Sequence, residues 1–188
     1  LAINVMVCPN CLFASIKEED FISLSESKFK KATLDMSAAL NSAIKQKVEE
    51  RKTIVKAYQL TSQNFGKERT YRAATVSYLL ASSCAHLKLE HKVPFTLYEL
   101  AHNYLRAAKM AEFATIKDGE EFMEPKIAEF LKQSAGYFTE CFEKEGYPPR
   151  ECETTLYLTC VVLLFTGDDK KCKLFFRRLD DYKRQTPA

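Results

Sequence analysis

Hydrophobic residues recur every three or four positions along most of this chain, and this periodicity constrains the fold more than any other feature. Such an interval places the residues on one face of an α-helix. Five glycines and six prolines in 188 residues also leave few of the tight turns that an all-β fold needs. We therefore expect an all-α protein of antiparallel helical hairpins. The longest hydrophobic stripe lies within residues 24–62 and consists of Phe29, Ala32, Met36, Leu40, Ala43, Ile44, Val48, Val55 and Tyr58.

Start and stop signals divide this periodic pattern into separate helices. Ser23 with Glu26, and Thr96 with Glu99, have the spacing of capping boxes, which begin helices. The first stripe has a break predicted near Arg51-Lys52. The predicted helices span residues 24–62, 68–89, 96–118, 125–145, 151–165 and 168–182.

The last two predicted helices resemble a tetratricopeptide unit, a helix-turn-helix of about 34 residues. That pattern alternates large and small residues, and the small ones let the two helices approach closely. It ends on an aromatic residue that fills the gap to the next hairpin. The interval Ala114–Met123 is too long for a standard turn and is interpreted as an insertion. The alternative is any antiparallel helical bundle, which shares much of this periodicity. With Glu153 as the first position, the matching residues are Leu156, Cys160, Leu163, Cys172 and Phe176.

Residues 2–14 alternate loosely and carry β-branched residues, which predicts a short strand that runs into the knuckle Cys8-Pro9-Asn10-Cys11. A structural zinc ion needs four ligands, so one CxxC pair is half of a site, and the other pair is expected upstream of Leu1. Two alternatives stay open: a redox pair, which needs a helix directly behind it, and a pair of free thiols or a disulfide. We divide the chain into a knuckle remnant at 1–22 and a tetratricopeptide-like domain at 23–188.

The knuckle also carries a family resemblance. Val7–Ala14 followed by Asp20-Phe21 resembles the second knuckle of a bacterial family known as domain of unknown function 2225. The stretches Ala74–Ala111 and Leu156–Leu179 are similar to the helical part of that family. The resemblance implies a two-knuckle, zinc-ribbon-like start followed by tetratricopeptide-like helices, and it implies no activity.

Two departures from that family concern the metal. The first CxxC of the family is not in this sequence, and Leu12 stands where the family has glycine. The resemblance implies zinc held by Cys8 and Cys11 in the intact protein. For this chain alone we expect no bound metal, because two ligands are too few for a structural zinc.

Charge and cysteine usage narrow the class of protein. A net charge of +3 is too small to favour nucleic acid or an anionic membrane. No apolar run approaches the roughly 20 residues of a membrane span. Seven cysteines, an odd number set mostly in apolar helical patterns, are typical of free thiols in a reducing compartment. We expect a cytoplasmic protein that does not associate with membranes.

No nucleophile, phosphate-loop or metal-hydrolase motif occurs, so we expect a non-catalytic protein. Stacked helical hairpins typically present a groove to a protein or peptide, and homodimer formation through exposed ends is a second hypothesis. The alternative function is a zinc-ribbon nucleic-acid-binding or regulatory module that uses the basic last helix. The residues predicted to contact a partner are Asn103, Tyr104, Arg106 and Tyr157.

Overall fold

The computed structural model describes residues 4–21, 38–66 and 68–185. In this part of the chain, seven α-helices accompany one two-stranded antiparallel sheet, so the predicted all-α fold with a short N-terminal strand segment is confirmed. The main elements are β1 (Met6–Val7), β2 (Ala14–Ser15), α1 (Ala38–Gln46), α2 (Val48–Ala57), α3 (Tyr71–Glu90), α4 (Thr96–Asp118), α5 (Glu124–Lys144), α6 (Cys152–Phe165) and α7 (Asp169–Gln185). The short 3-10 helices are η1 (Glu18–Phe21), η4 (Ser62–Phe65), η5 (Glu121–Met123) and η6 (Pro149–Glu151).

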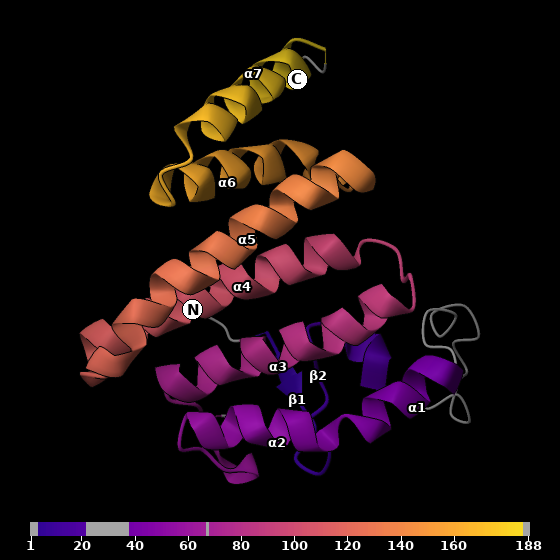
Figure 1. The fold of residues 1–188 in the computed structure, drawn as a ribbon, viewed down its shortest axis with the longest axis vertical. Helices are drawn as coiled ribbons and strands as arrows, with labels where there is room; N and C mark the ends of the chain where they lie inside the picture. The colour runs from indigo at the N-terminus through magenta and orange to yellow at the C-terminus, as the bar shows by residue number, and fades with distance from the viewer. Residues whose placement is uncertain (1–3, 22–37, 67, 186–188) are drawn as a thin grey trace.

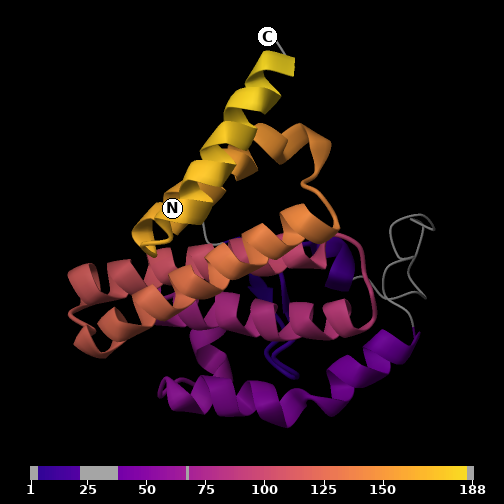
Figure 2. The ribbon, with the colours of Figure 1, turned by 45° about the horizontal axis from the view of Figure 1, so that its top comes forward.

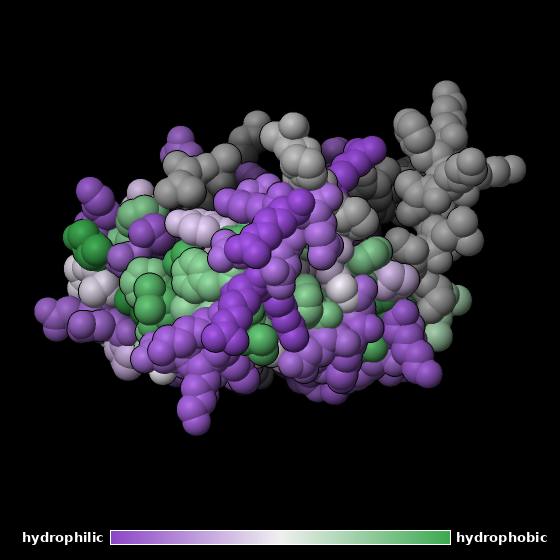
Figure 3. All heavy atoms as spheres, turned by 90° about the horizontal axis from the view of Figure 1, so that it is seen from above, coloured by the Kyte–Doolittle hydropathy of each residue, from purple (hydrophilic) through white to green (hydrophobic). Residues whose placement is uncertain are grey.

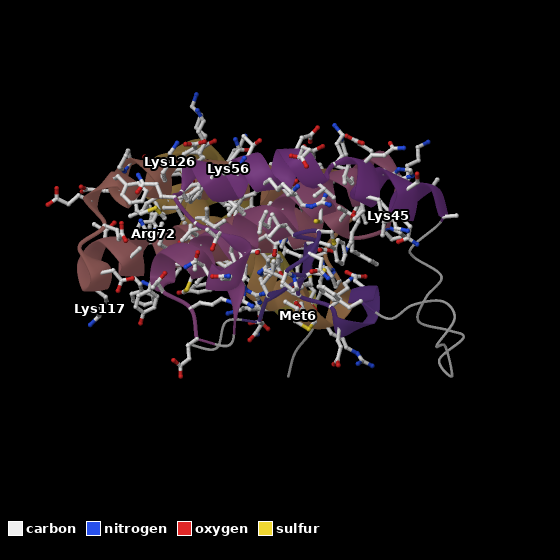
Figure 4. All side chains as sticks on the ribbon, turned by 90° about the horizontal axis from the view of Figure 1, so that it is seen from below. Met6, Lys45, Lys56, Arg72, Lys117 and Lys126 are labelled. Carbon is white, nitrogen blue, oxygen red and sulfur yellow. The ribbon has the colours of Figure 1, made fainter. Side chains whose placement is uncertain are left out.

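The helices α3 to α7 stack one after another (Figure 1), and each packs against the next. Arg72 near the start of α3 and Lys117 near the end of α4 lie at the same end of the molecule (Figure 4), as antiparallel neighbours must. The helices α1 and α2 and the β1–β2 hairpin lie at the α3 end of this stack, and α7 lies at the opposite end (Figure 2).

The predicted long first helix is divided in the structure. The break lies at Lys47, between α1 and α2, and not near Arg51-Lys52. Arg51 is involved in the break, because its Nη2 donates a hydrogen bond to the Ile44 carbonyl in the last turn of α1. The side chain thereby satisfies a carbonyl at a helix end. Residues 22–37, with the Ser23–Glu26 capping box and the predicted positions Phe29, Ala32 and Met36, lie outside the described residues.

The predicted capping box at Thr96 is wrong in detail. The residue that precedes α4 is Phe95, whose φ of 58° is left-handed. The Thr96 hydroxyl donates to the carbonyl of Val93 at 2.6 Å. Glu99 does not reach back to the helix start, because its carboxylate contacts the ammonium of Lys88.

The α6–α7 hairpin agrees with the predicted pattern at four of its five positions. Leu156, Cys160, Leu163 and Cys172 are buried, whereas Phe176 is 45% exposed and its neighbour Phe175 fills the core. The interval Ala114–Met123, predicted to be an insertion, forms the last turns of α4, a left-handed glycine and η5. Because α4 and α5 span 23 and 21 residues, they are longer than the helices of a 34-residue unit. The tetratricopeptide subtype stays a prediction.

The N-terminal hairpin shares a hydrophobic core cluster with α3 and α4. Val5, Leu12 and Ala14 pack in the same cluster as the inner faces of α3 and α4. A second large cluster joins α5, α6 and α7. A third, small cluster surrounds Cys84 of α3 and contacts both knuckle cysteines. The knuckle is therefore fixed to the helical stack through buried side chains.

Candidate functional site

The turn between β1 and β2 carries the two knuckle cysteines. The Cys8 N–H donates to the Phe13 carbonyl at 2.8 Å, and the Leu12 N–H donates to the Cys8 carbonyl at 2.9 Å. Leu12 has a φ of 56°, so the left-handed backbone expected at the family's glycine position is adopted here by leucine. That conformation costs about 1–2 kcal/mol for a residue with a side chain. Burial of Leu12, which is 4% exposed, offsets this cost by about 2 kcal/mol.

The surroundings of the two sulfurs differ. Burial raises the pKa of the Cys8 thiol, but the N–H groups of Cys11 and Asn10, together with the charge of Arg51, bring that pKa below its ordinary value. Burial raises the pKa of the Cys11 thiol, and the neighbouring Cys8 sulfur raises it further. A turn that directs N–H groups at one sulfur stabilises a thiolate, which is the form that binds metal.

Arg51 lies beneath the knuckle and is completely buried. Its Nε donates to the Cys11 carbonyl at 3.1 Å, and its Nη2 donates to the Ile44 carbonyl. Its Nη1 is buried and has no hydrogen-bond partner among the described residues. The guanidinium therefore joins the knuckle to the α1–α2 break while one of its nitrogens stays unsatisfied.

Two thiols on a preformed turn fit a thiolate-preferring ion such as Zn²⁺, and the buried charge of Arg51 favours the thiolate form that binds it. The sulfur of Cys84 lies close by, but burial raises its pKa to about 11, even though the Ala14 N–H points at it. Within the described ranges no group of three or more His, Cys, Asp and Glu side chains is placed to hold a metal. Cys8 and Cys11 thus remain two candidate ligands of a site that needs two more.

A buried ionic network fixes the segment that follows the knuckle. The Lys88 ammonium of α3 lies 2.7 Å from Oδ2 of Asp20 in η1 and 3.1 Å from Oε1 of Glu99 in α4. The Ser15 hydroxyl donates to Asp20 as well. Burial disfavours the charge on Lys88, but Glu99 and Asp20 outweigh it and raise the pKa of the ammonium.

The four residues predicted to contact a partner do not converge. Asn103 is fully buried in α4 and is not accessible to a partner, which corrects its assignment. Tyr104 of α4 stacks on Tyr137 of α5 and lines an open hollow of about 530 Å³ between α2, α3, α4 and α5. Arg106 is half-buried beside His102, whose pKa its charge lowers. Tyr157 alone is well exposed, on the outer face of α6.

A larger apolar surface lies where α5 meets the α6–α7 turn. A hollow of about 730 Å³ is lined there by Ile127, Ala128 and Leu131 of α5 together with Leu163 and Phe165 of α6. Figure 3, viewed from above, shows hydrophobic side chains on both sides of the polar outer face of α7. The exposed hydrophobic residues of α6 and α7 are Tyr157, Leu164, Phe165, Leu174 and Phe176.

The helix α6 explains why this surface is apolar. Its sequence, CETTLYLTCVVLLF, is hydrophobic on all sides after its first turn. A helix of this kind is usually buried all round. Here one face packs in the core through Leu156, Cys160 and Leu163, while Phe165 on the opposite side is 73% exposed. Of these exposed residues, only Tyr157 was predicted to contact a partner, although the unbroken hydrophobic run at 160–165 was a signal for Leu164 and Phe165.

The basic residues of α7 are partly engaged inside the molecule. Lys171 pairs with Asp168 and Lys183 pairs with Glu153, at 3.7 Å and 3.3 Å. The guanidinium of Arg178 lies over the Phe142 ring at 4.2 Å. These contacts engage three of the basic side chains of α7 inside the molecule.

The family model of DUF2225, an uncharacterized protein conserved in bacteria, matches residues 1–187. This chain belongs to that family. The match covers the knuckle and every helix described above, so the resemblance inferred from the knuckle residues is confirmed. No curated protein and no solved structure matches the chain. Within the described residues of this DUF2225 protein, no helix has both the length and the hydrophobicity to cross a membrane.

Proposed function

We propose that this DUF2225 protein is a non-catalytic scaffold that binds a protein or peptide partner on the apolar surface of α5, α6 and α7. The supporting observation is the exposed face of α6, where Leu164 and Phe165 are 60% and 73% exposed beside the hollow at α5. Isolated exposed apolar residues are common, but a contiguous group around a hollow usually marks an interaction site. An amphipathic helix is the partner that such a groove accommodates best.

We also propose that Cys8 and Cys11 supply two ligands of a structural zinc site in the intact protein. When bound, zinc would crosslink the β1–β2 hairpin to the segment that carries the remaining ligands. The metal content of the intact protein, measured by elemental mass spectrometry, tests this part. A zinc content near zero would contradict it.

The scaffold proposal is tested by selecting peptides from a displayed library of bacterial coding sequences on the wild-type chain. Selected peptides should bind a Leu164→Glu/Phe165→Glu variant at least about tenfold more weakly, because apolar contacts at an interface centre carry most of the affinity. Ile116→Glu is the matched control, since Ile116 is 66% exposed and lies outside the hollow. Failure to enrich any peptide, or equal binding by the groove variant, would refute the proposal.

The alternative function, nucleic-acid binding by α7, has a different signature. Binding through phosphates weakens steeply with salt, by a power that follows the number of contacts. The pairing of Lys171 and Lys183 with acidic neighbours argues against it. A gel-shift experiment with DNA and RNA at low salt discriminates the two functions, because the scaffold proposal expects no shift.

A further inference from the structure

Arg51 is an unusual residue to find in the interior of a small protein. Its side chain is 0% exposed, and its known contacts are two backbone carbonyls, those of Cys11 and Ile44. No ion pair joins it to a carboxylate in the part of the chain that the structure describes, and its Nη1 has no hydrogen-bond partner there. By contrast, the other deeply buried cation, Lys88, has two carboxylates around it.

A buried guanidinium without an anion is strongly unfavourable, because both its charge and its N–H groups lose water. The bond from Nε to the Cys11 carbonyl holds the positive charge directly against the knuckle. Thiols are neutral and would not compensate this charge. Three or more thiolates around one divalent metal ion would, because their summed negative charge then exceeds the charge of the metal.

We propose that Arg51 is the charge-compensating and positioning residue of a metal–thiolate site at Cys8 and Cys11, for a thiolate-preferring divalent ion such as Zn²⁺. This inference rests on the zinc knuckle proposed above. Arg51 does not ligate the metal. It holds the Cys11 carbonyl through Nε, reaches the Ile44 carbonyl through Nη2, and so places its positive charge against the backbone of the knuckle.

The charge balance also bears on the missing ligands. Two thiolates and one Zn²⁺ sum to zero, and each additional thiolate adds one negative charge. A site completed by two neutral imidazoles would leave Arg51 uncompensated. A third thiolate would give the site one negative charge, which Arg51 balances, and a fourth would give it two, of which Arg51 offsets one. Arg51 therefore indicates that at least one of the remaining ligands is a cysteine.

The test compares zinc affinity in the intact wild-type protein, Arg51→Met and Lys52→Met, by competition with a chromophoric chelator. Methionine keeps the apolar bulk of arginine and removes the charge. Loss of a residue that supports metal ligands typically weakens binding by about 10- to 100-fold. The control residue, Lys52, is 46% exposed at its side chain and pairs with Glu49, so Lys52→Met should leave affinity unchanged.

A second measurement separates compensation of charge from simple packing. The Arg51→Met substitution is made in two backgrounds, the zinc-loaded wild type and a Cys8→Ser/Cys11→Ser variant. In each background, the urea midpoint is compared with and without the substitution. If Arg51 compensates thiolates, the substitution lowers the midpoint in the first background and leaves or raises it in the second. An equal decrease in both backgrounds would show a merely structural arginine and would overturn the inference.

The outcomes distinguish this inference from the zinc proposal on which it rests. If the wild type binds no zinc, the zinc knuckle itself is refuted, and this role of Arg51 with it. If the wild type binds zinc and Arg51→Met binds it equally well, only the role of Arg51 is refuted. Should Arg51→Met not fold, Arg51→Lys replaces it: the retained charge should preserve stoichiometric zinc, and loss of zinc would contradict the inference.

Discussion

The ammonium nitrogen of Lys88 lies 2.7 Å from Oδ2 of Asp20, and both side chains are almost completely buried where η1 meets α3. Glu99 of α4 completes the network. Sixty-eight residues separate Lys88 from Asp20 along the chain, so this contact connects the knuckle segment with the two central helices. The knuckle segment is thus held to α3 and α4 by buried ion pairs as well as by the hydrophobic contacts of Val5, Leu12 and Ala14.

Replacing Lys88 by methionine should therefore destabilise the fold severely. The substitution leaves two carboxylates buried without a cation, and removing one partner of a buried pair costs about 3–5 kcal/mol. Urea unfolding measures this difference. Lys144→Met is the matched control, because Lys144 pairs with Glu140 at 66% side-chain exposure, and such surface pairs contribute at most about 1 kcal/mol. Similar effects of the two substitutions would contradict the structural role of Lys88.

Because the backbone of Leu12 is left-handed, glycine should be less destabilising than alanine at this position, the reverse of the usual order in a helix. Both Leu12→Gly and Leu12→Ala remove a buried side chain, but only glycine accepts a φ of 56° without strain. We expect both variants to be less stable than wild type in urea, with Leu12→Gly more stable than Leu12→Ala by about 1 kcal/mol. At Leu80, which is buried within α3, the usual order with alanine above glycine should hold. The usual order at Leu12 would contradict this account.

The helices were predictable because their signal is local. Asp118-Gly119 ends α4 with a glycine at φ 70°, and Pro125 lies in the first turn of α5, as such signals indicate. The break at Lys47 was not predictable, since it involves Arg51 and a carbonyl on the preceding turn. The bounds of α4 were predicted correctly, but its capping box was not, because Glu99 contacts Lys88 and not its own helix end.

The candidate site was only half predictable, for the same reason. The CxxC spacing is a local pattern, and it identified Cys8 and Cys11. Neither Arg51 nor Lys88 was predicted to belong to a site, because no spacing along the sequence reveals a partner forty or more residues away. Asn103 was placed on an exposed face, yet it lies on the inner side of α4. Exposure of a single position depends on which neighbouring helix covers it, and a periodic pattern does not specify that neighbour.

The hydroxyl of Tyr147 offers a further test of the α5–α6 junction. It donates to the Phe138 carbonyl at 2.9 Å and lies 2.8 Å from the Thr159 hydroxyl, in a buried position. Tyr147→Phe leaves both partners without this contact and should cost about 1–2 kcal/mol in urea unfolding. Tyr157→Phe is the matched control, since Tyr157 is 55% exposed and its loss should change stability by less than about 0.5 kcal/mol. Equal effects would contradict the assigned hydrogen bonds.

Acid sensitivity should depend on His102, whose ring lies between Tyr98 at 4.3 Å and Phe138 at 5.0 Å. Burial first, and then the charge of Arg106, lowers the pKa of His102 to about 4. Because the unfolded chain takes up this proton near its ordinary pKa of about 6.5 and the folded chain does not, stability falls between pH 6.5 and pH 4. The loss is on the order of 3 kcal/mol when complete.

His102→Phe keeps a ring in place and should remove this part of the slope, while it leaves stability at pH 7.5 within about 1 kcal/mol of wild type. Urea unfolding at pH 7.5, 5.5 and 4.5, values chosen to bracket this window, measures both slopes. Parallel slopes in the two proteins would mean that His102 takes up its proton at the same pH in the folded and the unfolded chain, and would contradict the lowered pKa.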